Sequence, residues 1–169
     1  MTYYNPVFHY GESAFAAQAK KSGVDGLIVP DLPPEEAKNF IAEARINDIS
    51  TIFFLAPTTT PHRTRHIIAA STGFIYYVSL TGVTGARRQL SSTLKEQVEL
   101  ARILTDKPIC VGFGVSTAAQ VRSVAGISDG VIVGSAIVNE IQKNTGKDHL
   151  VGNVSRFVRQ LSGCRNVAI

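Results

Sequence analysis

Short runs of apolar and β-branched residues alternate along the chain with longer stretches in which apolar residues recur every three or four positions. The short runs are almost continuously apolar, which is typical of parallel strands buried on both faces. They occupy residues 24–29, 49–55, 74–78, 108–111 and 130–133, and residues 1–5 predict a further strand. The pattern therefore predicts a series of strands, each followed by a helix.

The stretches between the strands carry helix start and stop signals. Thr60-Pro61 suits the N-cap and first position of a helix, and Pro33-Pro34 predicts the start of another. Ser91 or Ser92 and, later, Ser116 are predicted caps of two more helices. The last helix has the clearest amphipathic stripe, formed by Leu150, Val154, Phe157, Val158 and Leu161.

The spacing of the strands bears on the fold. Strand starts at residues 24, 49 and 74 are evenly spaced. A series of strand–helix units fits either a doubly wound sheet or a TIM barrel, and even units favour the barrel. A full barrel needs about 250 residues, whereas this chain of 169 residues offers about six units and contains no linker. We therefore predict a single domain over residues 1–169, a TIM (β/α)8 barrel with about six of its eight β/α units, the alternative being an open sheet.

The composition argues against several classes of function. The 17 Lys and Arg residues are spread along a chain of net charge +4, without the clustering and interleaved aromatics of a nucleic-acid site. No apolar run approaches the ~20 residues of a membrane-spanning helix, and the first residues lack the features of a signal peptide. We expect no nucleic-acid or membrane partner and a cytoplasmic location, or a plastid one in a plant.

The cysteine and histidine spacing predicts no metal site. Cys110 and Cys164 are expected to be reduced, mostly buried thiols. His62 and His66 stand four positions apart, but they lack the Glu of a zinc-binding His-Glu-x-x-His helix and are interleaved with arginines. The pattern favours a solvated helix face, and we expect neither a metal nor a cofactor.

Two glycine turns follow the last two predicted strands. Gly112-Phe113-Gly114 comes after residues 108–111, and Gly134-Ser135 comes after residues 130–133. Glycine lets backbone N–H groups approach a phosphate, and a helix N-terminus favours the anion. A dinucleotide fingerprint belongs in the first unit with an acid about 20 residues further on, where this chain has Gly134. The last two loops of a TIM barrel commonly hold a phosphate, so we expect a small phosphorylated metabolite. The alternative is that these glycines only turn the chain.

Five segments are specific when taken together and in this order. They are Tyr-Tyr-Asn-Pro-Val-Phe at 3–8, Gly-Val-Asp-Gly-Leu-Ile-Val-Pro-Asp-Leu-Pro-Pro-Glu-Glu at 23–36, Ser-Leu-Thr-Gly-Val-Thr-Gly-Ala-Arg at 79–87, Gly-Phe-Gly-Val-Ser at 112–116 and Val-Gly-Ser-Ala-Ile-Val at 133–138. Through them the chain resembles the alpha chain of tryptophan synthase from Met1 to the last helix. The resemblance implies a TIM barrel lyase of tryptophan biosynthesis, which cleaves indole-3-glycerol phosphate to indole and glyceraldehyde 3-phosphate by a retro-aldol reaction.

The resemblance also implies roles for individual residues. The substrate phosphate would be held by Gly85, Phe113, Gly114, Gly134 and Ser135. Tyr76 and Ile132 would line the indole pocket, and Tyr3 would lie near the catalytic carboxylates. Thr84 would lie on a lid within the long loop of residues 79–90, whose Gly and Thr content and length after a strand independently suggest a lid.

The family usually pairs with a beta chain that uses pyridoxal phosphate to join indole to serine. By resemblance, Asn5, Pro6 and Phe8 would lie in a loop facing that beta chain, and Asp31 would lie in another loop on the same side of the barrel. Asp31 also suits a simple turn before Leu32-Pro33, and we do not assign it a catalytic role.

The family's two acid/base carboxylates come from the second strand and the loop after it, whereas the resemblance begins in the third strand. We therefore expect no catalytic residue in this chain and no activity from it alone. The chain would then be part of a longer barrel, or its open strand edges would be covered by a second copy. Two other functions stay open: a non-catalytic partner that modulates a beta chain, and a different phosphate-binding barrel enzyme.

Overall fold

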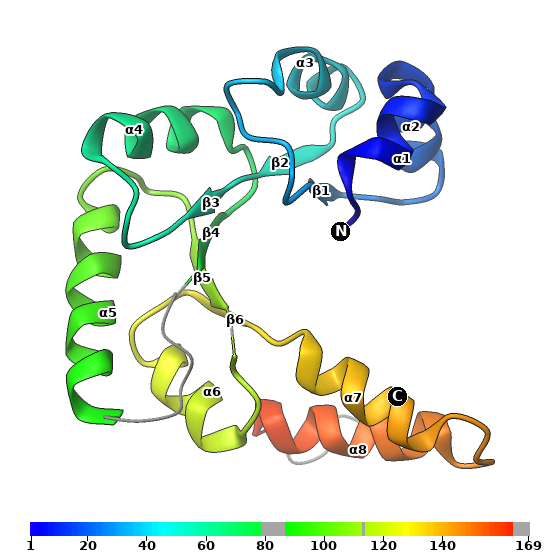
Figure 1. The fold of residues 1–169 in the computed structure, drawn as a ribbon, viewed down its shortest axis with the longest axis vertical. Helices are drawn as coiled ribbons and strands as arrows, with labels where there is room; N and C mark the ends of the chain where they lie inside the picture. Colours follow the sequence, from blue (N-terminus) through cyan, green and yellow to red (C-terminus); the bar gives the residue numbers. More distant parts are fainter. Residues whose placement is uncertain (79–86, 113, 164–169) are drawn as a thin grey trace.

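The computed structural model describes residues 1–78, 87–112 and 114–163. The strands are β1 (Gly26–Ile28), β2 (Ser50–Ile52), β3 (Phe54–Leu55), β4 (Ile75–Val78), β5 (Ile109–Gly112) and β6 (Gly130–Ile132). The helices are α1 (Tyr4–Tyr10), α2 (Glu12–Lys21), α3 (Lys38–Ile46), α4 (Pro61–Ala70), α5 (Arg87–Arg102), α6 (Ala118–Ala125), α7 (Ser135–Asn144) and α8 (Leu150–Ser162). From β1 to α7 strands and helices alternate as the apolar pattern predicts, except that β3 follows β2 directly, and α8 then follows α7 (Figure 1).

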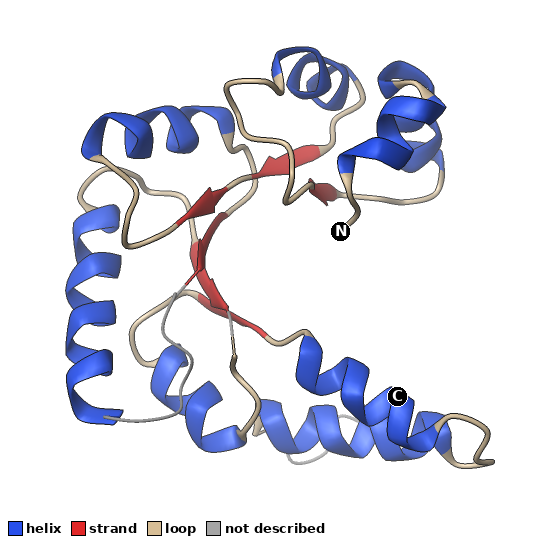
Figure 2. Ribbon diagram, in the orientation of Figure 1, coloured by secondary structure: helices blue, strands red, loops and turns tan. Residues whose placement is uncertain are grey.

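All strand pairs are parallel and follow the order of the chain. β1 pairs with β2, and β3, β4, β5 and β6 pair in sequence. The two parts are joined through Phe53, so the predicted strand 49–55 is present but interrupted. Figure 2 shows the strands following a strong curve with α3, α4 and α5 on its convex side. Sequential parallel neighbours joined by outer helices form part of a (β/α) barrel, whereas a doubly wound sheet reverses its strand order.

The convex face of the sheet forms the core. Ile75, Tyr77, Ile109 and Val111 are buried there in one cluster with residues of α4 and α5. The alternate strand residues, which point to the concave face, are mostly only half-buried. The prediction of strands covered on both faces is therefore wrong for this chain, since no layer among the described residues covers the concave side.

The N-terminal segment differs from its predicted strand. Residues 4–10 form α1, and the segment before it joins β1 through the Thr2 N–H, which donates to the Ile28 carbonyl at 3.1 Å. Asn5, Pro6 and Phe8 consequently lie in a helix and not in the predicted loop. Pro6 is compatible with this helix because a proline in the first turn removes an N–H that has no partner within the helix.

Several helix starts also differ from prediction. Thr60 does cap α4, with its hydroxyl accepting from the Arg63 N–H at 3.4 Å. The cap of α6, however, is Thr117 and not Ser116, because Thr117 and Gln120 form a reciprocal capping box. Residues 91–92 lie inside α5, and Pro33-Pro34 lies in turns that precede α3 by several residues. Residues 87–90 of the predicted lid belong to α5, and its other residues, 79–86, lie outside the described part of the chain.

Candidate functional site

The concave face brings together the two residues predicted to line the indole pocket. Gly112 on β5 lies between Tyr76 on β4 and Ile132 on β6, since Gly112 pairs with Ile132 and the Tyr76 ring reaches over it. A Cβ at Gly112 would lie 2.6 Å from Tyr76 Oη and 2.9 Å from Ile132 Cβ. The absent side chain at Gly112 therefore makes room for the Tyr76 ring.

Phe54 extends this apolar surface. Its ring centroid lies 4.8 Å from that of Tyr76, with an angle of 38° between the rings. Burial raises the pKa of the Tyr76 phenol above its ordinary value, so the ring stays neutral at neutral pH. Phe54, Tyr76 and Ile132 thus form an apolar wall suited to a flat ring. Neither Phe54 nor the steric role of Gly112 was predicted from the sequence. Phe54 does lie between the buried Phe53 and Leu55 in an apolar strand, which is the sequence signal for a side chain on the opposite face.

The second glycine turn leads directly from this wall to the start of a helix. Gly134 is the N-cap residue of α7, and no side chain caps that helix. A Cβ at Gly134 would meet nothing within 4 Å, so the backbone there is open to approach. Ser135, the first residue of α7, is exposed. Uncapped N–H groups and the helix dipole together make this end of α7 suitable for an anion.

The first glycine turn is arranged differently. Gly114 has a φ of +70°, in the left-handed region that favours glycine. The amide oxygen of Gln120 accepts from the backbone N–H groups of Ser116 and Thr117, at 2.8 and 3.1 Å. Gln120 therefore occupies the two donors just before α6, and a capping box with Thr117 covers the start of that helix. Since no side chain caps α7, α7 is the stronger candidate for holding a phosphate.

Of the four remaining predicted site residues, the structure describes only Tyr3. Gly85, Thr84 and Phe113 lie outside the described residues. Tyr3 is exposed and lies near β1, at the opposite end of the strand order from β6. The places predicted for these four residues in the substrate site stay predictions.

The segment predicted to face a beta chain is exposed. Asn5, Pro6 and Phe8 are all exposed on α1, whereas Val7 is fully buried. Tyr3 and Tyr10 are also exposed, which gives α1 an aromatic outer surface. The Asp31 carboxylate does not point to the apolar wall, because its Oδ1 accepts from the Tyr4 N–H at 2.9 Å.

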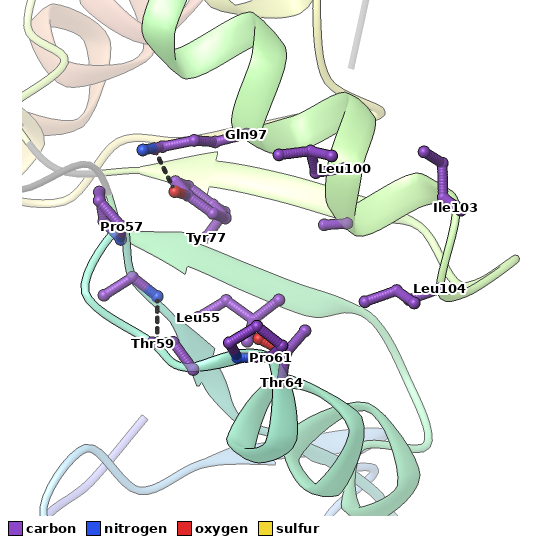
Figure 3. Close-up of a pocket in the computed structure, with 12 residues that line it drawn as sticks. Leu55, Pro57, Thr59, Pro61, Thr64, Tyr77, Gln97, Leu100, Ile103 and Leu104 are labelled. Carbon is purple, nitrogen blue, oxygen red and sulfur yellow. Dashed lines mark hydrogen bonds between the residues drawn. The ribbon is translucent and has the colours of Figure 1, made fainter.

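A groove of about 410 Å³ lies on the other side of the sheet, between α4 and α5 (Figure 3). Leu55 and Tyr77 form its floor, and it is flanked by the exposed Leu100 of α5 and Leu104 of the turn after that helix. Burial raises the pKa of Tyr77 to about 12, and its hydroxyl donates to Gln97. None of the described residues predicted for substrate or partner binding lines this groove, so the groove is separate from the apolar wall and from the start of α7.

The described residues hold no group of His, Cys, Asp and Glu side chains that could bind a metal ion. Within the same residues, no helix has both the length and the apolar character needed to span a membrane. The candidate site therefore rests on backbone donors at α7 and on the apolar wall.

Comparison with known proteins gives a consistent result. Residues 1–164 match the family model described as tryptophan synthase alpha chain. The tryptophan synthase alpha chain of Pelobacter propionicus is 45% identical over 161 residues, which cover 95% of this chain and 60% of the relative. That of Roseiflexus sp. (strain RS-1) is 47% identical over 163 residues, covering 96% and 62% respectively. The chain thus spans about three-fifths of the length of these curated relatives.

Solved structures agree. Tryptophan synthase subunit alpha from Campylobacter jejuni has a TM-score of 0.85 and 32% identity, with 94% of this chain and 62% of that chain covered. A chain of the tryptophan synthase a2b2 complex from Pyrococcus furiosus has a TM-score of 0.83 and 39% identity, with coverage of 97% and 66%. These neighbours confirm the predicted TIM barrel fold class, with about six strands present here.

Proposed function

This chain belongs to the tryptophan synthase alpha chain family, and we propose that it supplies the phosphate site, the indole-binding wall and the lid of an alpha subunit in tryptophan biosynthesis. The reaction of that subunit is the retro-aldol cleavage of indole-3-glycerol phosphate to indole and glyceraldehyde 3-phosphate. The observation that carries the proposal is the short distance along the chain, from Ile132 to Gly134, between an apolar wall and an uncapped helix start. A substrate with an indole ring at one end and a phosphate at the other needs both features.

The phosphate would lie at the start of α7, with Gly134 and Ser135 as its main contacts. Backbone N–H groups there have no competing side-chain cap, and the Ser135 hydroxyl supplies a further donor. Gly114, Phe113 and Gly85 would complete the site, and Thr84 would close the lid over it.

The indole would lie against Tyr76 and Ile132. Burial of its apolar surface favours binding by about 25 cal/mol per Å², and aromatic contacts with Tyr76 and Phe54 add geometric preference. Tyr3 would approach the substrate from the other end of the sheet.

The chemical step needs groups that these strands lack. Breaking the carbon–carbon bond at C3 of the indole requires a proton donor at C3 and a base that removes a proton from the side-chain hydroxyl. The described concave residues of β4, β5 and β6 are Tyr76, Val78, Cys110, Gly112, Gly130 and Ile132, none of which is a carboxylate. We therefore propose that the 169 residues bind substrate but do not turn it over, and robust cleavage of indole-3-glycerol phosphate by the purified chain would refute this.

The phosphate site can be tested by Gly134→Asp. The new carboxylate has room, because a Cβ at Gly134 meets nothing within 4 Å, and it would occupy and repel the anion site. We expect titration calorimetry with indole-3-glycerol phosphate to show at least a tenfold loss of affinity. Gly152→Asp is the matched control, since Gly152 on α8 is equally open. Equal affinity in the Gly134→Asp variant and the unmodified chain would overturn the proposed site.

A second candidate function is that of a non-catalytic partner that binds and modulates a beta chain. The exposed Asn5, Pro6 and Phe8 of α1 favour it, and a structure of the Pyrococcus furiosus relative is described as showing mutual activation in an a2b2 complex. Adding the chain to a tryptophan synthase beta subunit should raise the rate of tryptophan formation from indole and serine. No complex and no change of rate would exclude this function.

The bacterial sources of the relatives support a cytoplasmic location.

A further inference from the structure

Helix α1 depends on a carboxylate from a distant part of the chain. It has seven residues, too few for a helix to be stable by itself in water. Its N-cap residue, Tyr3, makes no side-chain cap. In its place the Oδ1 atom of Asp31, 27 positions along the sequence, accepts from the Tyr4 N–H at 2.9 Å. The start of α1 is therefore fixed to the loop that follows β1.

The other anchors of α1 act on different parts of the helix. Val7 is fully buried and fixes its middle. The Tyr4 hydroxyl donates to Oε1 of Glu12 at 2.9 Å, which links the helix to α2. The Asp31 bond alone among these three fixes the backbone at the first turn, where Asn5 and Pro6 are exposed. The negative charge of the Asp31 carboxylate also interacts favourably with the N-terminus of α1.

We propose that Asp31 is a positioning residue for partner docking, which holds the first turn of α1 in the orientation that a beta chain recognises. This inference rests on the proposed docking of a beta chain at α1. Asp31 then acts through Asn5, Pro6 and Phe8, and does not need to touch the beta chain itself. The loop after β1 and helix α1 consequently behave as one docking surface, since a hydrogen bond ties one to the other.

Three variants test the inference. Asp31→Ala removes the acceptor, and Asp31→Asn keeps an amide oxygen that can accept the same hydrogen bond. Asp148→Ala is the control, since it removes an exposed carboxylate from the loop between α7 and α8, outside the proposed docking surface. Hydrogen exchange of the Tyr4 to Tyr10 amides, measured on the free chain, reports on α1 without any partner. We expect about fivefold faster exchange in Asp31→Ala, the factor given by one lost N-cap bond of typical strength, and near-normal exchange in the other two variants.

Binding to a purified tryptophan synthase beta subunit is the second readout. We expect Asp31→Ala to bind more weakly by up to about fivefold, because the competent fraction of α1 cannot fall by more than the change in its opening equilibrium. Asp31→Asn and Asp148→Ala should bind as the unmodified chain does. Normal exchange in Asp31→Ala would overturn the positioning role. Equal losses of affinity in both Asp31 variants, with normal exchange in Asp31→Asn, would also overturn it, because the Asp31 charge would then contact the partner directly. If the unmodified chain binds no beta subunit while Asp31→Ala still speeds exchange, the proposed docking fails and the anchoring of α1 by Asp31 stands.

Discussion

At the scale of single residues, the shape of the apolar wall depends on the small size of Gly112. The Tyr76 ring occupies the volume that a side chain at Gly112 would fill, and Ile132 closes the other side. Neither neighbour has an easy way to retreat, since both belong to strands that pair with β5. One hydrogen atom in place of a methyl group therefore sets the position of the ring against which we expect indole to bind.

Gly112→Ala should be destabilising and should weaken indole binding. Overpacking of this kind typically costs about 1–3 kcal/mol, and the displaced Tyr76 ring would no longer present the same surface. Urea unfolding gives the stability change, and fluorescence or calorimetric titration with an indole compound gives the affinity. Gly152→Ala is the control, because a Cβ at Gly152 in α8 would have no neighbouring atom within 4 Å and alanine favours a helix. Equal stability of the two variants would contradict the steric role of Gly112.

The residue scale also separates what the sequence could and could not predict about the site. Tyr76 and Ile132 were predicted from family resemblance, and the structure places them on either side of Gly112. The glycine turn at Gly134 was predicted from its position after a strand. The steric role of Gly112 was not, because it depends on cross-strand register, which brings together residues from three strands.

At the scale of elements, helix and strand starts are fixed by hydrogen bonds whose two partners lie at very different separations along the sequence. Thr60 caps its own helix three residues away, and sequence reasoning finds such local caps readily. Helix α1 was missed because its cap comes from Asp31, 27 positions away. Between these extremes, Thr117 was missed by one position, since its extended backbone and the partner Gln120 decide between it and the adjacent serine.

Asp129 fixes the start of β5 in the same way. Its carboxylate accepts from the Ile109 N–H at 2.8 Å and from Arg102 of α5 at 2.9 Å. The pKa of Asp129 is lowered chiefly by the bond from Ile109 and further by Arg102. Because the pKa is lower in the folded state, the ionised carboxylate stabilises the fold at pH values above 3.8, the ordinary pKa of an Asp carboxyl. This contribution is lost as the pH falls below 3.8 and through the lower pKa of the folded state.

We therefore expect Asp129→Asn to lower the urea midpoint at pH 7 and to have a smaller effect at pH 3. The size of the effect is reduced by solvent, because the Asp129 side chain is 38% exposed. Urea unfolding curves of both proteins at the two pH values measure the difference. An equal difference at pH 7 and pH 3 would show that the carboxylate charge makes no contribution.

At the scale of the whole molecule, the curved sheet has one face packed against helices and one face largely without cover. Buried residues on the convex face alternate with half-buried residues on the concave face. The fold class was predictable from the alternation of strands and helices and from their even spacing. The uneven burial of the two faces was not, because apolar strand sequences give no information on which neighbouring layers are present.

We expect the isolated chain to self-associate through its concave face and open strand edges. Sedimentation velocity should show an average mass that rises with protein concentration and does not fall with added salt, because the contact would be apolar. Val78→Lys, on the concave face of β4, should reduce the association. Val138→Lys, at an exposed position of α7, should leave it unchanged. A monomer at all concentrations would exclude this assembly.

The contrast between the starts of α6 and α7 has a consequence for ligand selectivity. Thr117 and Gln120 form a capping box at the start of α6, whereas α7 has no side-chain cap, so a bound ligand would take the place of that cap. The strength of this capping depends on the charge that the ligand carries. The second ionisation of a phosphate ester has a pKa of about 6, so the dianion predominates at neutral pH and the monoanion in mild acid. The helix end would therefore favour a phosphate monoester over a diester, and its grip on the substrate would weaken as the pH falls through 6.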